Sequence, residues 1–219
     1  MCVIAIKPKG TDFPEDGLFT ALWERNPDGA GFMYADHGKV CIRKGFMRLP
    51  EFLEAAGELK ESLTDPAGTP AVFHFRIATH GGTKPGNCHP FAISDSVAVL
   101  QNPLVNTDVG VAHNGTIYVT PRPDISDTME YILTGLSCIK KRNPRFFEDE
   151  RELRRIGYAI GSRMAFLAAD GTIATVGDFT EEDGMLFSNT LFRHARRRTS
   201  GSGTYSYEDE EYGRLGLWD

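Results

Sequence analysis

Apolar residues along the chain fall into short runs and helical stripes that are separated by polar and turn-forming residues. Runs of β-branched or alternating apolar residues predict strands, and apolar residues spaced three or four positions apart predict helices. Strands are expected at residues 2–6, 71–79, 96–100, 109–113 and 185–192, and hairpins at 31–43 and 164–176. Helices are expected at residues 14–25, 50–63, 124–137 and 147–160.

Turn signals fix the hairpins and limit the first helix. Asp36-His37-Gly38 and Asp170-Gly171 mark the two hairpin turns. Pro14 lies in the first turn of the first helix, and Asn26-Pro27 stops it. Strands and helices are mixed without strict alternation, which predicts a layered α+β domain rather than a dinucleotide-binding fold. The sequence also has no GxGxxG or P-loop motif.

The composition changes after His194. Arg196-Arg197-Arg198 is followed by Ser, Gly and Tyr residues and then by the acidic stretch Glu208–Glu211. Such a segment has too few apolar residues to form a core. We therefore expect one folded domain at residues 2–194 and a flexible tail at 195–219.

Composition and charge exclude several classes of protein. The chain of 219 residues is 41% hydrophobic, and its 24 basic and 30 acidic residues give a net charge of −6. This balance argues against a nucleic-acid-binding protein, which needs a basic face. No apolar run reaches the roughly 18 residues of a membrane span. The apolar stretch Cys2–Ile6 is also too short for a signal peptide. These features predict a cytoplasmic protein.

Cysteine stands at positions 2, 41, 88 and 138, with no CxxC pair. This spacing argues against a zinc site, and in a reducing compartment the four thiols are expected to be free. Buried cysteines usually serve as small hydrophobic residues, which suits Cys41 and Cys138. Cys2 differs, because removal of Met1 would make it the N-terminal residue.

Four of the six histidines lie in three compact motifs between residues 74 and 113. In chain order the motifs are His74-Phe75-Arg76-Ile77-Ala78-Thr79-His80-Gly81, Asn87-Cys88-His89-Pro90 and His113-Asn114-Gly115. Asp28-Gly29-Ala30-Gly31 precedes them and Ser126-Asp127-Thr128 follows. The histidines lack the tight spacing of metal ligands and no carboxylate pair accompanies them, so we expect no metal.

Each motif also has a purely structural interpretation. Alternate residues from His74 to His80 would share one polar face of a strand. Asn114-Gly115 is a common hairpin turn, and Asp28-Gly29 is equally typical of a turn. Ser126-Asp127-Thr128 precedes an apolar helical run and suits a helix N-cap.

The ordered set of motifs behind Cys2 resembles the glutaminase domain of class II glutamine amidotransferases, which are N-terminal nucleophile hydrolases. The resemblance covers residues 2–130 by motif and extends to about residue 194 by the order of elements. It implies a four-layer αββα sandwich of two antiparallel sheets, and it implies no cofactor.

The resemblance also implies roles for individual residues. The Cys2 thiol would attack the glutamine side-chain amide, and its α-amine would act as the base, because an α-amine has a pKa near ~7.7–8.0. The Asn114 side chain and the Gly115 backbone N–H would stabilise the oxyanion. Substrate binding would fall to Arg76 for the α-carboxylate, Asp127 for the α-ammonium, and, in less specific roles, Thr79, His80 and His89.

Four departures from the family pattern bear on function. Ile77 replaces the tryptophan that gates an ammonia channel in the aminosugar branch, which puts such channelling in doubt. Asn26-Pro27 stands where many members have Arg-Gly. Extra residues at 101–108 are expected to lengthen a hairpin or to form a lid, and nothing after about residue 194 is expected to hold an acceptor domain.

Three functions therefore stay open. The leading hypothesis is a stand-alone glutaminase domain that hydrolyses L-glutamine and releases ammonia for an acceptor, such as a synthetase, on another chain. The second is a hydrolase of γ-glutamyl amides in small metabolites. The third is a non-catalytic binding module that kept the pocket. No nucleic acid or membrane partner is expected.

Overall fold

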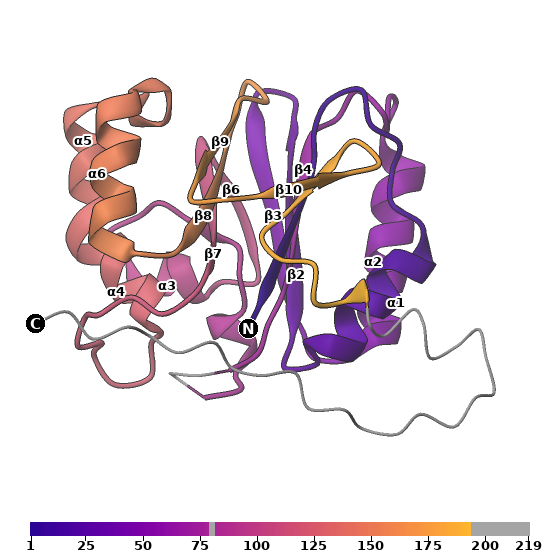
Figure 1. Cartoon of the computed structure of the whole chain (residues 1–219), viewed down its shortest axis with the longest axis horizontal. Coiled ribbons are helices and arrows are strands. Elements are labelled where there is room, and N and C mark those ends of the chain that lie inside the picture. Colours follow the sequence, from indigo (N-terminus) through magenta and orange to yellow (C-terminus); the bar gives the residue numbers. More distant parts are fainter. Residues whose placement is uncertain (79–81, 194–219) are drawn as a thin grey trace, which may run out of the picture.

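The computed structural model describes residues 1–78 and 82–193, and within them the chain is an α+β protein with two antiparallel sheets (Figure 1). The larger sheet has seven strands in the order β10-β11-β1-β4-β2-β3-β6. Its strands are β1 (Val3–Lys7), β2 (Ala30–Asp36), β3 (Lys39–Phe46), β4 (Ala71–Phe75), β6 (Leu104–Thr107), β10 (Thr180–Glu182) and β11 (Met185–Phe187).

The smaller sheet has four strands in the order β5-β7-β8-β9. They are β5 (Phe91–Ala92), β7 (Val109–Asn114), β8 (Arg163–Ala168) and β9 (Ile173–Val176). About five helices accompany the sheets in the described residues. They are α1 (Asp16–Arg25), α2 (Leu49–Ser62), α3 (Val97–Gln101), a continuous helix made of α4 (Asp127–Tyr131), a π-helical turn (Ile132–Leu136) and α5 (Ser137–Arg142), and α6 (Glu150–Ile160).

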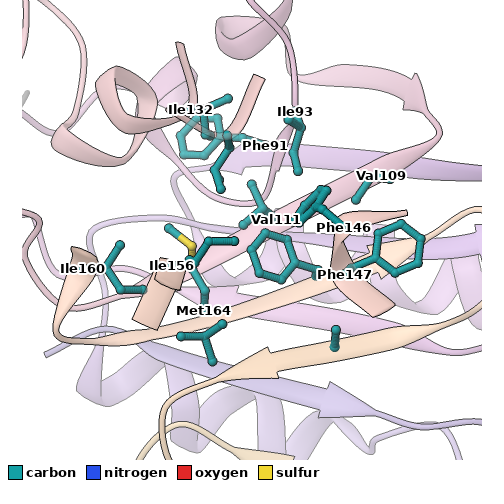
Figure 2. Packing of buried hydrophobic residues seen from close by; sticks show 14 of the residues in the cluster. Phe91, Ile93, Val109, Val111, Ile132, Phe146, Phe147, Ile156, Ile160 and Met164 are labelled. Carbon is teal, nitrogen blue, oxygen red and sulfur yellow. The ribbon is translucent and has the colours of Figure 1, made fainter. Parts of the chain in front are cut away.

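Three clusters of buried side chains hold these elements together. An aromatic cluster packs α1 and α2 against the larger sheet, with Phe19 and Phe73 ring centroids 4.9 Å apart. A second cluster packs α4, the π-helical turn and α6 against the smaller sheet, as Figure 2 shows for Ile132, Ile156 and Met164. A third contains apolar residues from both sheets, so the two sheets share a core.

Most of the expected elements are confirmed. The first strand, both hairpins, the strand at 109–113 and the four helices are present, with boundaries that shift by a few residues. The hairpin turn at residues 36–38 places His37 and Gly38 at positive φ, as its sequence signal requires. The expectation of an α+β protein with two antiparallel sheets is therefore confirmed.

The strand expected at 96–100 is wrong, because the segment forms α3. Ser96 caps this helix by accepting a hydrogen bond from Val99 N at 3.5 Å, and Leu100 is its buried residue. A short apolar run is compatible with either a strand or a helix, so periodicity could not separate them.

Three other boundaries differ in ways that matter for function. The strand expected at 71–79 ends at Phe75, so Arg76 and Ala78 do not continue a strand face with His74. Residues 101–108 do not lengthen a hairpin: β6 pairs with β3 in the larger sheet, while the following β7 belongs to the smaller one. The last strand, expected at 185–192, ends at Phe187.

The tail expected at 195–219 lies outside the described residues. Within the described ranges, no helix is both long enough and apolar enough to cross a membrane.

Candidate active site

The Cys2 thiol lies directly before β1 and faces the backbone of Ile77. Ile77 N–H donates to Cys2 Sγ at 3.3 Å, and Sγ lies 3.4 Å from Ile77 O. Burial raises the pKa of the Cys2 thiol, whereas the hydrogen bond from Ile77 and the charge of Arg76 lower it. Because burial is the largest of these effects, the thiol needs a base to become a nucleophile at neutral pH.

The segment Asp28–Gly31 holds the chain that follows β4. Asp28 N donates to Arg76 O at 3.0 Å, Arg76 N donates to Gly29 O at 2.8 Å, and an Asp28 carboxylate oxygen accepts from Ala78 N at 2.9 Å. Gly31 is required by close packing, because a Cβ there would lie 2.3 Å from the His89 carbonyl oxygen. This motif therefore shapes the loop that carries Arg76 beside Cys2.

Arg76 is almost fully buried, at 4% exposure, and one of its guanidinium nitrogens donates to Gly82 O at 2.9 Å. Its positive charge acts on the Cys2 thiol and also on the thiol of Cys88. Arg76 is thus a fixed cation next to the candidate nucleophile, as a carboxylate-binding residue would have to be.

Asn114 and Gly115 lie at the end of β7, in the smaller sheet. Asn114 is 1% exposed, and its side-chain Nδ2 donates to Ser188 Oγ at 2.9 Å. Gly115 has φ +145° and is exposed, and a Cβ there would lie 2.4 Å from Ser162 Cβ. Both the conformation and the close contact require glycine at this position.

Asp127 is buried at the first position of α4 and supports the turn after Asn114. One carboxylate oxygen accepts from Ile117 N at 2.7 Å and the other from Thr128 N at 2.8 Å. The N-cap of the helix is Ser126, whose Oγ accepts from Met129 N at 3.2 Å. The structural interpretation of this motif is therefore confirmed for Ser126, and both oxygens of Asp127 already hold backbone amides.

His74, His89 and His113 form a buried group between the sheets. The rings of His74 and His89 stack with centroids 4.3 Å apart, and the His89 and His113 centroids are 6.4 Å apart. Burial lowers the pKa of His74 to about 3 and that of His113 to about 4, and it also lowers that of His89. His89 is 5% exposed and neither ring nitrogen has a hydrogen-bond partner among the described residues.

Two site residues were missed by the sequence analysis. Ser188 and Asn189 follow β11 directly, where a strand was expected to continue. Ser188 Oγ accepts from both Asn114 Nδ2 and Ile4 N, each at 2.9 Å. Asn189 Nδ2 donates to the Cys2 carbonyl oxygen at 2.7 Å. The sequence feature that could have indicated these two residues is a Ser-Asn pair at the end of an apolar strand. The same pair is also typical of an ordinary turn.

The structure thus groups some of the predicted residues and separates others. Cys2, Arg76, Asn114 and Gly115 come from the ends of β1, β4 and β7, and hydrogen bonds through Ile77, Ile4 and Ser188 connect their strands. His89 is instead packed in the interior against His74 and Phe91. Thr79 and His80 lie outside the described residues.

A surface cavity of about 510 Å³ lies elsewhere, between α6 and the β8–β9 hairpin. Ser162 lines it and lies 2.7 Å from His113 Nε2, but none of the predicted site residues that the structure describes lines it. Within the same described ranges, no three His, Cys, Asp or Glu side chains gather in a way that could hold a metal ion.

Comparison with known proteins found no family model and no curated protein that matches this chain.

Proposed function

We propose that this protein is a class II type glutaminase, in which Cys2, made N-terminal by removal of Met1, hydrolyses the side-chain amide of L-glutamine. Glutamate is one product, and ammonia is released for an acceptor on another chain. The observation that carries the proposal joins three separate parts of the sequence. The Cys2 thiol accepts from the backbone N–H of Ile77, directly after the buried Arg76. Ile4, two residues after Cys2, shares the hydroxyl of Ser188 with Asn114.

The arrangement of elements supports an αββα sandwich of the N-terminal nucleophile hydrolase type. One cluster joins α1 and α2 to the larger sheet, another joins α4 and α6 to the smaller sheet, and a third lies between the sheets. Figure 1 shows the two groups of helices on opposite sides of the molecule, with the N-terminus near the middle. These three clusters support the layer order that the sequence resemblance implies.

The reaction follows from groups on Cys2 itself. The free α-amine takes the thiol proton, and the thiolate attacks the amide carbon. The resulting oxyanion accepts hydrogen bonds from the second N–H of Asn114 Nδ2 and from Gly115 N–H. The amine passes its proton to the departing nitrogen, which leaves as ammonia. Water then hydrolyses the γ-glutamyl thioester, with the amine again moving the proton.

Substrate recognition falls to a fixed cation and a fixed anion. Arg76 binds the α-carboxylate, and Asp127 accepts from the α-ammonium with the lone pairs that its backbone contacts leave. Thr79 and His80 belong to the same proposal through the sequence resemblance, whereas His89 packs against His74 and Phe91 in the interior and is given no substrate contact. No metal or cofactor takes part in it.

A second candidate is a hydrolase of γ-glutamyl amides in small metabolites. These amides carry the same free amino-acid head group as glutamine and differ only in the group on the amide nitrogen, so the same Cys2 chemistry and the same head-group contacts would serve both. Arg76 already donates to Gly82 O, and both oxygens of Asp127 already hold backbone amides. If these contacts are the whole function of the two residues, the head group of either substrate is bound by other residues.

The test compares two substrates on the full chain. Release of glutamate and ammonia from L-glutamine supports the first function, and cleavage of γ-glutamyl anilide alone supports the second. A diazo-ketone analogue of glutamine is expected to label Cys2 and to spare Cys41, Cys88 and Cys138. Absence of both activities from protein with a free Cys2 amine would leave only a binding module.

A further inference from the structure

We propose that Ser188 and Asn189 are positioning residues that hold the nucleophile and the oxyanion-stabilising amide in fixed relation to each other. This inference rests on the proposed function. Neither residue would touch the substrate, and both would act through other residues, Ser188 through Asn114 and Asn189 through Cys2. They stand together directly after β11, which pairs with β1, the strand that begins beside the nucleophile.

Ser188 joins the two sheets at the site. Its backbone N–H donates to Ile4 O at 3.0 Å, which continues the β11–β1 pairing by one more residue. Its hydroxyl oxygen accepts from Ile4 N in the larger sheet and from Asn114 Nδ2 in the smaller one. Ser188 and Asn114 are only 2% and 1% exposed, so solvent cannot replace the hydroxyl as an acceptor.

This contact determines where the Asn114 amide points. A primary amide nitrogen has two N–H donors. One of them is used by Ser188, and the direction of the other is then set by the planar geometry of the amide. Oxyanion stabilisation depends on donors that are already in place before the charge develops. Without Ser188, the Asn114 amide could rotate about its last side-chain torsion and lose that alignment.

Asn189 performs the matching task for Cys2. Its Nδ2 holds the Cys2 carbonyl oxygen at 2.7 Å, and its Oδ1 accepts from Leu191 N at 3.2 Å, which fixes the side chain at both ends. Cys2 has no preceding secondary structure to restrain it, because β1 begins at Val3. The carbonyl contact therefore fixes the backbone to which both the thiol and the α-amine are attached.

The first test uses Ser188→Ala in the full chain with Met1 removed. We expect kcat for L-glutamine to fall about 10- to 100-fold, which is less than the loss of a whole oxyanion donor, while KM stays within about twofold. Ser188→Thr keeps the hydroxyl and is expected to recover most of kcat. Ser96→Ala, which removes a hydroxyl from the cap of α3, is the matched control and should leave both constants unchanged.

The second test uses Asn189→Asp, a nearly isosteric change at a half-buried position that keeps the acceptor for Leu191 N. It replaces the donor to Cys2 O by a carboxylate oxygen, so the negative charge should move the acidic limb of the kcat/KM profile to higher pH by about one unit. Asn106→Asp makes the same change on the exposed edge strand β6 and should leave the profile in place.

The outcomes separate this inference from the proposed function. Suppose that the wild-type protein turns over its substrate. If folded Ser188→Ala then keeps the wild-type kcat, or if Asn189→Asp keeps the wild-type pH profile, the positioning role is overturned and the proposed function stands. If Ser188→Ala does not fold, the Asn189→Asp profile decides. Absence of wild-type turnover on both L-glutamine and γ-glutamyl anilide would overturn the proposed function and the positioning role with it.

Discussion

Two groups of buried polar residues lie close together in this protein, and they differ in how their hydrogen-bonding atoms are used. In the first group, Ser188 and the half-buried Asn189 beside β1, together with Asp127 at the start of α4, each hold backbone or side-chain partners at 2.7–2.9 Å. In the histidine group, His89 has no partner for either ring nitrogen, and His74 has none for Nδ1 among the described residues.

The difference has opposite consequences for function and stability. Hydrogen bonds to backbone groups fix the first group in one geometry, which catalysis requires. In the second group, His113 has partners for both ring nitrogens, Thr128 Oγ1 and Ser162 Oγ. His89 contributes a ring that stacks and fills space, at the cost of burying two polar nitrogens without a partner among the described residues. We therefore expect substitutions in the first group to change turnover more than stability, and substitutions in the histidine group to do the reverse.

The sharpest test of the expectation that substitutions around Cys2 change turnover more than stability is Cys2→Ala. The change removes the proposed nucleophile, so turnover of L-glutamine should fall by at least about 10⁴-fold. The side chain is only half-buried and its sulfur contacts one backbone residue, so the melting temperature should stay near that of wild type. A folded Cys2→Ala protein with appreciable activity would contradict the mechanism.

Retention of Met1 should abolish turnover nearly as completely. The nitrogen of Cys2 then belongs to an amide and cannot act as a base, while the thiol, whose pKa is raised by burial, stays protonated. Met1 is 67% exposed and accessible to a peptidase. Intact mass and activity should be measured on the same preparations, and full activity in protein that uniformly keeps Met1 would refute the amine as base.

Smaller effects are expected from Arg76→Lys and Asp127→Asn, which alter the proposed contacts with the two charges of glutamine. Leaving a buried ligand charge without its partner costs about 2–5 kcal/mol, which corresponds to roughly thirty-fold to a few thousand-fold in affinity. The loss should appear mainly in KM for L-glutamine.

The γ-glutamyl anilide assay gives these two variants a second readout. Because this substrate carries the same head group, its KM should rise in parallel with that of L-glutamine. If KM for both substrates is unchanged while both variants fold normally, Arg76 and Asp127 are structural residues, and a substrate without a free amino-acid head group becomes the better hypothesis. Asp127→Asn should also lower the melting temperature, because its carboxylate holds Ile117 N and Thr128 N.

The sequence was sufficient to predict most of the fold, because the elements carry strong local signals. Asp36-His37-Gly38 and Asp170-Gly171 specify turns through residues that tolerate positive φ. The short segment at 96–100 was misassigned because its four apolar residues, 97–100, fit a buried strand as well as a helix. Strands β5, β6 and β10 have two to four residues each and depend on pairing with distant strands.

The candidate site was predicted unevenly for a related reason. Cys2, Arg76 and Asn114 stood out because they lie in an ordered set of motifs that resembles a known family. Ser188 did not, because its importance comes from contacts with Ile4 and Asn114, which are 184 and 74 residues away. His89 was placed with the substrate through the family resemblance of its motif, whereas its packing against His74 and Phe91 places it in the interior.

The smallest expected effect concerns the histidine group, whose substitutions are expected to change stability more than turnover. It is measured through the pH dependence of the free energy of unfolding. Burial holds the pKa of His74 at about 3 and that of His113 at about 4, and it lowers that of His89, against an ordinary value of 6.5. The folded chain therefore keeps these rings neutral where the unfolded chain protonates them. Their contribution to stability is complete above about pH 6.5 and is lost as the pH falls toward the folded-state values.

His89→Phe removes one of these rings and replaces it with an apolar one between His74 and Phe91. At pH 7 the free energy of unfolding should change by no more than about 1 kcal/mol, because no hydrogen bond to the described residues is lost. Between pH 6.5 and 4 its slope should be shallower than that of wild type by up to about 1.4 kcal/mol per pH unit. Urea unfolding at a series of pH values measures this slope. His37→Gln, at the exposed turn between β2 and β3, is the control for the loss of a surface histidine. If the pH slope of the unfolding free energy is unchanged in His89→Phe, His89 is protonated in the folded protein. It would then belong with the residues proposed to bind substrate and not with the residues that only fill the core.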